Sequence, residues 1–432
     1  MLKKDLFLYG YISFYLDYPE KELRRSRGVR QESVRYMSNF IFISPNFPEN
    51  YWHFCDQLKK NGMNVLGIGD CPYDNLSSEL RASLTEYYKV GSLENYDEVY
   101  KAVAFFIFKY GRIDWLESNN EYWLEQDARL RTDFNITSGF RTEDMPYVKF
   151  KSRMKLRYRK AGIPVARYHI VDDKKNCMNF IRRVGYPVIA KPDNGVGASH
   201  TCKISNEEEL DAFLTSRLPI TYIMEECVKG RVCSYDAIIN SKGEPIFETG
   251  NITDNSIMDI VNDAMDCAFY MVRDLNPKIR DAGRRAVAAF GVKSRFIHLE
   301  FFELSEDQEG LGAKGDIVGL EVNMRPSGGY SPEMHNNANS TDVYKLYADM
   351  ITYDRSDYPI SADYNCAFVG RRDARTYAYS DEEICDKYRE HLCMYGRLAD
   401  ALSSAMGNRI IMAKFRTLEE LYSFFNDCVL PG

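Results

Sequence analysis

The sequence of 432 residues lacks several features that would assign it to a common class of protein. No apolar stretch approaches the length of a membrane span, and no low-complexity tract or repeat is evident. Basic residues are not in excess: the formal net charge of −7 argues against a nucleic-acid binder that relies on a basic surface. The eleven cysteines include no Cys-x-x-Cys pair, which indicates single thiols in a reducing compartment rather than a disulfide framework or a zinc site.

The N-terminal residues 1–38 are aromatic and then basic, and their role is unclear from the sequence. The apolar run Leu6–Leu16 follows two lysines, as in a signal peptide. It is interrupted by Gly10 and tyrosines and lacks a small-residue cleavage site. We therefore expect a cytoplasmic protein.

Residues 39–147 alternate between short apolar strands and amphipathic helices, which is typical of a parallel sheet with crossover helices. No Gly-x-Gly-x-x-Gly follows the first strand, so a dinucleotide site is not supported. Glu121 follows a strand end, where α/β sheets tend to place functional groups, although a solvent-facing or capping glutamate is favoured. The expected strands are Asn39–Ser44, Val65–Ile68 and Ile113–Leu116, and the expected helices are Asn50–Asn61, Tyr96–Tyr110 and Glu121–Thr132.

The stretch Phe296–Gly329 is predicted to be a β-hairpin that carries polar side chains on one face. Residues two apart in a strand share a face, so Glu321, Asn323 and Arg325 point one way, and Glu300 on the other strand joins them when the strands pair. Magnesium prefers such hard oxygen ligands and completes its shell with substrate phosphates. For either strand alone, a half-exposed hairpin with solvated charges is the simpler interpretation.

A second group of residues is suited to binding an anion. The strand ending at Lys191 leads into the loop Asp193–His200, whose small residues allow several backbone N–H groups to face one anion. A loop with two glycines is weak evidence alone, since most are turns. Upstream, Lys149–Ala161 is predicted to be a basic helix, and a solvated charged face is its simplest explanation.

Together these motifs resemble the nucleotide-binding part of the ATP-grasp superfamily, in particular the carboxylate–amine ligases similar to D-alanine–D-alanine ligase and biotin carboxylase. The resemblance implies an α/β (α+β ATP-grasp) fold in which a parallel-sheet domain precedes a two-lobed nucleotide domain. The expected divisions are an extension at 1–38, the first domain at 39–147, a small lobe at 148–220, a metal and substrate lobe at 221–362 and a C-terminal α/β segment at 363–432.

The same resemblance implies roles for individual residues. Magnesium (or manganese) would be bound by Glu300, Glu321 and Asn323, and Arg325 and Lys191 would be catalytic. In the family, the loop at 193–200 closes over the nucleotide as a lid, and the segment Thr221–Gly230 reads the adenine edge through its backbone. The residues expected to bind ATP are Lys151, Lys191, Gly195, Gly197, Ser199, Glu225, Glu226 and Val228.

The sequence departs from the family at one position. Many relatives place a glutamate for the ribose hydroxyls after Gly230-Arg231, where this chain has Val232. The ribose contact would then come from Glu225 or Asp236. Among the remaining polar residues, His298 is expected to orient a neighbour rather than to bind metal, and Tyr330 and His335 are not favoured as pocket residues.

The implied function is an ADP-forming carboxylate–amine (or carboxylate–thiol) ligase that acts on small molecules or amino acids through an acyl phosphate. The alternatives are an ATP-grasp phosphotransferase and a non-catalytic ATP-binding module. We expect small carboxylate and amine substrates, no nucleic acid and no membrane, and the sequence leaves a homodimer open.

Overall fold

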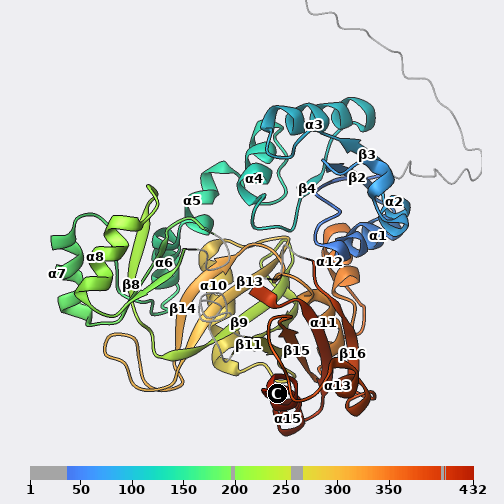
Figure 1. Cartoon of the computed structure of the whole chain (residues 1–432). Helices are drawn as coiled ribbons and strands as arrows, with labels where there is room; N and C mark the ends of the chain where they lie inside the picture. Colours follow the sequence, from blue (N-terminus) through green and yellow to red (C-terminus); the bar gives the residue numbers. More distant parts are fainter. Residues whose placement is uncertain (1–36, 196–199, 254–265, 400–402, 404) are drawn as a thin grey trace, which may run out of the picture. The chain divides into compact units, whose positions relative to one another are not determined.

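The computed structural model describes residues 37–195, 200–253, 266–399, 403 and 405–432 (Figure 1). The chain divides into two units at Tyr36, and the second, Met37–Gly432, is the one described below. The N-terminal extension lies outside the described residues except for its last two positions. No helix in the described ranges is long and apolar enough to cross a membrane.

A parallel sheet opens the described chain, as the alternating pattern predicted. Strand β1 is buried on both faces: Phe40 and Phe42 join one apolar cluster, and Ile41 and Ile43 join another. A strand covered on both sides reads as a continuous apolar run, which explains its sequence. The order is β3 (Glu86–Lys89), β2 (Asn64–Gly69), β1 (Asn39–Ile43), β4 (Trp115–Glu117), with α1 (Trp52–Lys60), α2 (Ser78–Ser83), α3 (Tyr96–Tyr110) and α4 (Leu124–Asp133). Strand β3 and helix α2 were not predicted from the sequence.

A small antiparallel sheet forms the next layer of structure along the chain. Its helices bury apolar residues such as Phe180 and Phe213 against the strands, in a separate core. The helices are α7 (Lys174–Val184) and α8 (Glu207–Ser216), and the strand order is β5 (Tyr168–Ile170), β8 (Tyr222–Glu226), β6 (Val188–Pro192), β7 (Cys202–Ile204).

A large, mainly antiparallel sheet holds the predicted hairpin at one edge. Its order is β14 (Ile317–Asn323), β13 (Arg295–Leu304), β9 (Gly230–Ile239), β11 (Asn251–Thr253), β12 (Cys267–Met271), β15 (Asn365–Arg371), β17 (Arg409–Phe415), β16 (Leu392–Arg397), with β10 (Pro245–Thr249) paired to β9. The C-terminal segment therefore continues this sheet through β15, β17 and β16 instead of forming a sheet of its own.

Helices cover both faces of the large sheet. Helix α10 (Pro277–Phe290) begins at an asparagine cap: the Asn276 side chain accepts a hydrogen bond from the Lys278 N–H, with proline in the first turn. It ends at Gly291, whose left-handed φ of 67° suits glycine. The other helices are α11 (Ser331–Asn339), α12 (Val343–Tyr353), α13 (Asp381–Lys387) and α15 (Leu418–Val429).

The predicted basic helix Lys149–Ala161 is wrong in its extent, and the solvated charged face expected of it holds for Arg153, Arg159 and Lys160 but not for three of its lysines. Phe150 has an extended backbone (φ −93°, ψ 117°) that separates α5 (Met145–Lys149) from α6 (Lys151–Lys160). Lys149, Lys151 and Lys155 are buried rather than solvated. The run of basic residues therefore includes three lysines whose side chains lie at buried positions.

Buried charges join the first domain to the β13–β14 hairpin. The Arg295 guanidinium on β13 lies 2.6 Å from the Glu117 carboxylate at the end of β4 and donates a hydrogen bond to the Met324 carbonyl (2.8 Å). The same Glu117 oxygen pairs with Arg131 at 3.3 Å. These contacts fix the backbone immediately after Asn323 to the first domain.

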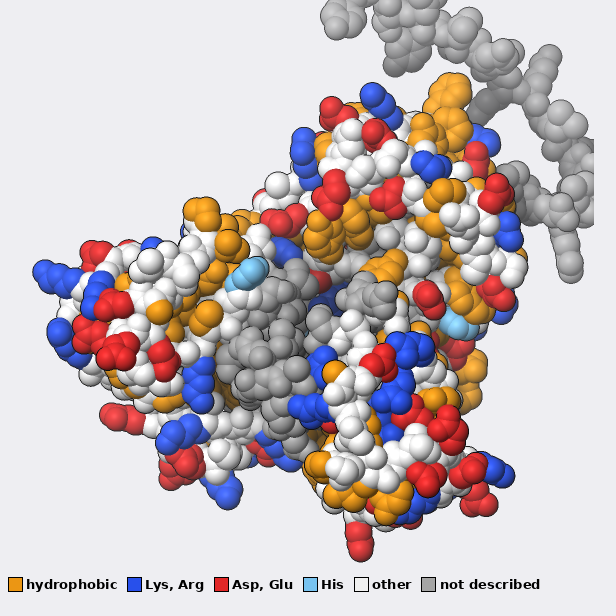
Figure 2. Space-filling model, viewed as in Figure 1, with side chains coloured by type: hydrophobic (Ala, Val, Ile, Leu, Met, Phe, Trp, Pro, Cys, Tyr) orange, Lys and Arg blue, Asp and Glu red, His pale blue; other side chains and the backbone are white. Residues whose placement is uncertain are grey.

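The visible face in Figure 2 carries interspersed acidic and basic side chains. This agrees with the charge balance of the sequence, in which neither sign dominates.

Glu333 gives a testable pH dependence of stability. It lies on α11, where the Asn50 side-chain amide donates to it at 2.7 Å and the Tyr344 hydroxyl also donates to it. Burial raises the pKa of Glu333 from about 4.5 to about 7. Its contribution to stability is thus present below pH 4.5 and is lost as the pH rises through 7.

We expect Glu333→Gln to reduce the fall in unfolding free energy between pH 4.5 and 8 by roughly 3 kcal/mol, at about 1.4 kcal/mol for each pKa unit. Urea unfolding at several pH values measures this. Glu382→Gln, at an exposed glutamate, is the control and should retain the wild-type slope. An unchanged slope in Glu333→Gln would contradict the assignment.

Candidate active site

A cavity of about 530 Å³ lies between the small sheet and the hairpin edge of the large sheet. Its floor runs across five adjacent strands, from β14 through β13, β9 and β11 to β12. The predicted site residues that line it are Lys151, Lys191, Gly195, Glu225, Glu226, Val228, Glu300, Glu321, Asn323 and Arg325. Gly197 and Ser199 lie outside the described residues, as do positions 196 and 198 of the predicted lid loop.

The hairpin register places the predicted metal ligands together. Glu300 pairs directly with Glu321, and His298 pairs directly with Asn323. Directly opposed residues in an antiparallel pair have side chains on the same face. The two carboxylates are about a quarter exposed and face the cavity, so this donor set of carboxylate and amide oxygens fits a magnesium ion.

His298 is held between two carboxylates. Its Nδ1 lies 2.7 Å from Asp236 Oδ1, and its Nε2 lies 3.2 Å from Glu300 Oε1. Burial lowers the pKa of His298, but the two carboxylates outweigh it and raise the pKa to about 9. A protonated His298 donates to both neighbours, and it therefore orients Glu300.

The cations of the cavity each have a nearby oxygen. Lys151 Nζ lies 3.1 Å from Glu321 Oε1 and donates to the Gly195 carbonyl at 3.0 Å. Arg325 donates through Nη2 to Asn323 Oδ1 at 3.2 Å. Lysine and arginine side chains from α6, β6 and the end of β14 therefore meet the acidic hairpin at one place.

Both carboxylates of strand β8, Glu225 and Glu226, are paired with basic side chains. Glu225 lies between Lys155 Nζ (2.9 Å) and Lys191 Nζ (3.1 Å). Burial raises the pKa of Glu225, but the two lysines outweigh it and hold the pKa at about 2. Glu226 binds the Arg167 guanidinium at 2.6 Å and accepts from the Arg167 N–H.

The proposed ribose contact through Asp236 is wrong. The Asp236 side chain is completely buried and is bound by His298 and the Ser234 hydroxyl. Val232 does line the cavity. A carboxylate that is buried and already bonded to His298 and Ser234 is not available to a ligand in the cavity.

Glu121 was expected to face solvent, and this is also wrong. It is buried: one oxygen lies 2.9 Å from Lys149 Nζ, and the other lies 3.8 Å from Arg325 Nε. The strand-end position was the available signal, since that is where α/β sheets place functional groups. Glu121 thereby links the first domain to Arg325.

Several lining residues escaped the sequence analysis because they lie on strands that it did not predict. Asn251 and Thr253 come from β11, and Cys267 and Phe269 from β12. These short strands carry no motif.

As expected, neither Tyr330 nor His335 lines the cavity; His335 is buried between Phe247 and Phe296. The further described lining residues toward the C-terminus are Ser327, Gly328, Ser331, Ala405 and Met406.

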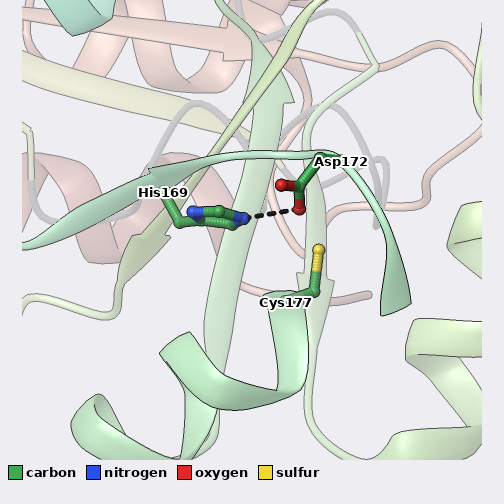
Figure 3. Close-up of side chains that lie close together, drawn as sticks. All are labelled: His169, Asp172 and Cys177. Atoms are coloured by element: carbon green, nitrogen blue, oxygen red, sulfur yellow. Dashed lines mark hydrogen bonds and ion pairs between the residues drawn. The ribbon is translucent and has the colours of Figure 1, made fainter. Parts of the chain in front are cut away.

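Another group of polar side chains lies where β5 leads into α7. Figure 3 shows the His169 ring and the Asp172 carboxylate pointing toward each other, with the Cys177 thiol close by. His169 Nε2 lies 2.8 Å from Asp172 Oδ1, and the Asn176 amide donates to the other oxygen at 2.9 Å. These hydrogen bonds satisfy Asp172 and close the connection between strand and helix.

The Asp236–His298 contact predicts a measurable pKa change. In Asp236→Asn the His298 imidazolium loses its nearest charge while burial still disfavours it, so its pKa should fall from about 9 to 6.5 or below. NMR titration of the imidazole nitrogens in metal-free protein measures this.

The matched control is Asp172→Asn, which removes the carboxylate beside a different histidine, His169. It should leave the titration of His298 unchanged. A pKa of His298 that stays near 9 in Asp236→Asn would show that Asp236 does not hold the proton.

Comparison with known proteins gives partial sequence matches. Residues 148–293 match the family model described as the ATP-grasp domain. The chain is 25% identical over 243 residues to the L-arginine-specific L-amino acid ligase of Bacillus subtilis, covering 54% of this chain and 56% of that protein. It is 34% identical over 90 residues to the carbamoyl phosphate synthase large chain of Clostridium botulinum (strain Eklund 17B / Type B), covering 20% of this chain and 8% of that protein. The chain therefore spans little more than half of the one relative and a small part of the other.

Solved structures resemble nearly the whole chain. An L-amino acid ligase from Bacillus licheniformis superposes with a TM-score of 0.68 at 14% identity, covering 91% of this chain and 97% of that one. The N5-carboxyaminoimidazole synthetase of Staphylococcus aureus gives a TM-score of 0.66 at 14% identity, covering 92% and 98%. At this identity the likeness shows a shared fold. Together with the family match, it confirms the resemblance found in the sequence: the chain carries an ATP-grasp domain.

Proposed function

We propose that this protein is an ATP-dependent, ADP-forming ligase that joins a small carboxylate to an amine through an acyl phosphate. One observation carries the proposal: Lys151, Lys191 and Arg325 share a single cavity with the oxygen ligands of the hairpin. Cations beside a metal-binding set of carboxylates are what a triphosphate requires.

The nucleotide would lie across the cavity, from the segment Thr221–Gly230 to the β13–β14 hairpin. Val228 and the backbone after Glu226 line one end, where an adenine ring is expected, and Ile189 on β6 lines the same cavity. The phosphates would meet Lys151 and Lys191. These assignments follow the resemblance residue by residue.

Glu300, Glu321 and Asn323 would hold magnesium (or manganese). When bound, the ion neutralises phosphate charge and aligns the triphosphate. In this arrangement His298 keeps the Glu300 carboxylate oriented, because it donates from Nε2 to that group.

The chemistry has two balanced steps. A carboxylate oxygen of the first substrate attacks the γ-phosphorus, forming an acyl phosphate and releasing ADP. The amine then attacks the acyl carbon, an amide bond forms, and inorganic phosphate leaves with loss of a proton from the amine. Positioning and charge neutralisation supply the catalysis, so no nucleophile from the protein is needed. Arg325, planar and always charged, would stabilise the transferred group or the tetrahedral intermediate.

Amino acids are the proposed substrate class, in view of two similar proteins. One is named an L-arginine-specific L-amino acid ligase and another an L-amino acid ligase. We further propose that the protein acts in the cytoplasm, in keeping with its free cysteines. The divisions proposed for the described chain are 39–147, 148–220, 221–362 and 363–432.

The test is incubation with ATP, magnesium and a panel of amino acids and small acids, with products identified by mass. We expect ADP, phosphate and an amide, and loss of turnover when magnesium is removed by a chelator. AMP as product would overturn the proposed mechanism. A phosphorylated acid without an amide would identify a phosphotransferase, and magnesium-dependent ATP binding without turnover would identify a binding module.

Glu321→Gln should lower the rate of ADP formation by about 100-fold or more, as expected for removal of a charged group that stabilises the transition state. The matched control is Glu309→Gln, which removes an exposed carboxylate from the connection of the same hairpin. It should leave the rate unchanged. Equal rates in Glu321→Gln and the wild type would contradict the role of Glu321.

A further inference from the structure

Helix α6 presents two lysines one turn apart, at positions that share a helix face. Lys151 lines the cavity, whereas Lys155 does not. Lys155 is only 1% exposed, although lysine is among the residues least often buried. A fully buried ammonium group is costly unless a negative charge compensates it, so its partner identifies its role.

That partner is Glu225, in the middle of the small sheet. Strand β8 lies between β5 and β6, and Glu225 is paired there with Tyr168 and Ile189. Its two oxygens are divided between two lysines: Oε1 lies 2.9 Å from Lys155 Nζ, and Oε2 lies 3.1 Å from Lys191 Nζ. Glu225 thus connects a lysine behind the cavity to a lysine inside it.

The charges of Lys155, Glu225 and Lys191 together determine how much positive charge is available to a phosphate. A lone glutamate opposite Lys191 would neutralise it and leave no net charge for a phosphate. With Lys155 on the other oxygen, the three groups together carry one net positive charge. Glu300 and Glu321 also act on Lys191 from the hairpin, so the competition for its ammonium group is strong.

We propose that Lys155 is a positioning residue for the nucleotide. It holds Glu225 in place and neutralises the Glu225 carboxylate, so that Lys191 stays oriented toward the phosphates and the cluster keeps one net positive charge. The inference rests on the proposed nucleotide site but not on the ligase chemistry. Lys155 itself does not line the cavity. Its effect passes entirely through Glu225.

The first test is nucleotide binding to the full-length protein, measured by calorimetry with the magnesium complex of a non-hydrolysable ATP analogue. Lys155→Met should weaken binding by about tenfold or more. Lys155→Arg, which keeps the positive charge, should remain within about threefold of the wild type. Lys160→Met, at an exposed lysine on the same helix, is the control and should bind as the wild type does. Wild-type affinity in Lys155→Met would overturn the proposal.

A double-mutant cycle separates positioning from general damage to the fold. If Lys155 acts through Glu225, then Lys155→Met should have little further effect on binding in a Glu225→Gln background. A full additive loss in the double variant would overturn the proposal. The double variant removes both members of the Lys155–Glu225 ion pair, so neither is left as an unpaired ion, and Glu300 and Glu321 still act on Lys191. It therefore remains informative if Lys155→Met alone does not fold.

If ligase turnover is found, the kinetic constants give a further check. Lys155→Met should raise the KM for ATP by about tenfold while kcat at saturating ATP changes less than threefold, because the groups that meet the reacting atoms are intact. A fall in kcat with an unchanged KM would overturn the proposal. A wild type that binds nucleotide but forms no amide would refute the proposed ligase function and leave the binding test unaffected.

Discussion

The pairing register of β13 with β14 is the constraint on which the candidate site depends. It sets Glu300 against Glu321 and His298 against Asn323, all on the cavity face. Because side chains alternate along a strand, a slip of one residue would turn one of the two rows toward the opposite face. The register is supported from behind by Tyr158 of α6, which lies against Gly319 and donates to the Glu321 carbonyl at 2.9 Å. A Cβ at Gly319 would come within 2.7 Å of that ring, so the close approach requires glycine there.

The same helix also brings basic groups to the acidic hairpin, and the cavity is internally compensated as a result. Lys151 faces Glu321, and Lys191 faces Glu225. Paired charges of this kind can stay buried without a ligand, whereas a set of cations alone would repel one another and favour neutral forms. A phosphate group entering the cavity would meet lysines that these carboxylates already hold in place. The site is therefore built before the nucleotide arrives.

Much of this arrangement is readable from the sequence, and the remainder has a physical reason for being hidden. Alternation predicted the hairpin, and the residues around Lys191 pointed to an anion site. The burial of Lys155 and of Glu121 was missed because each pairs with a residue distant in the chain, Glu225 and Arg325 respectively. Strands β11 and β12 are only three and five residues long, so no local pattern marks them. The break at Phe150 was hidden within a run of good helix formers.

The contact between Arg295 and Glu117 joins positions 178 residues apart and ends on the Met324 carbonyl, next to both Asn323 and Arg325. The first domain is thus held by buried contacts to the loop that carries Arg325. A chimaeric protein in which residues 39–147 were exchanged for those of a relative would need an acidic residue at the position of Glu117. Without it, the graft would leave the buried Arg295 unmatched and would disturb the loop that carries Arg325.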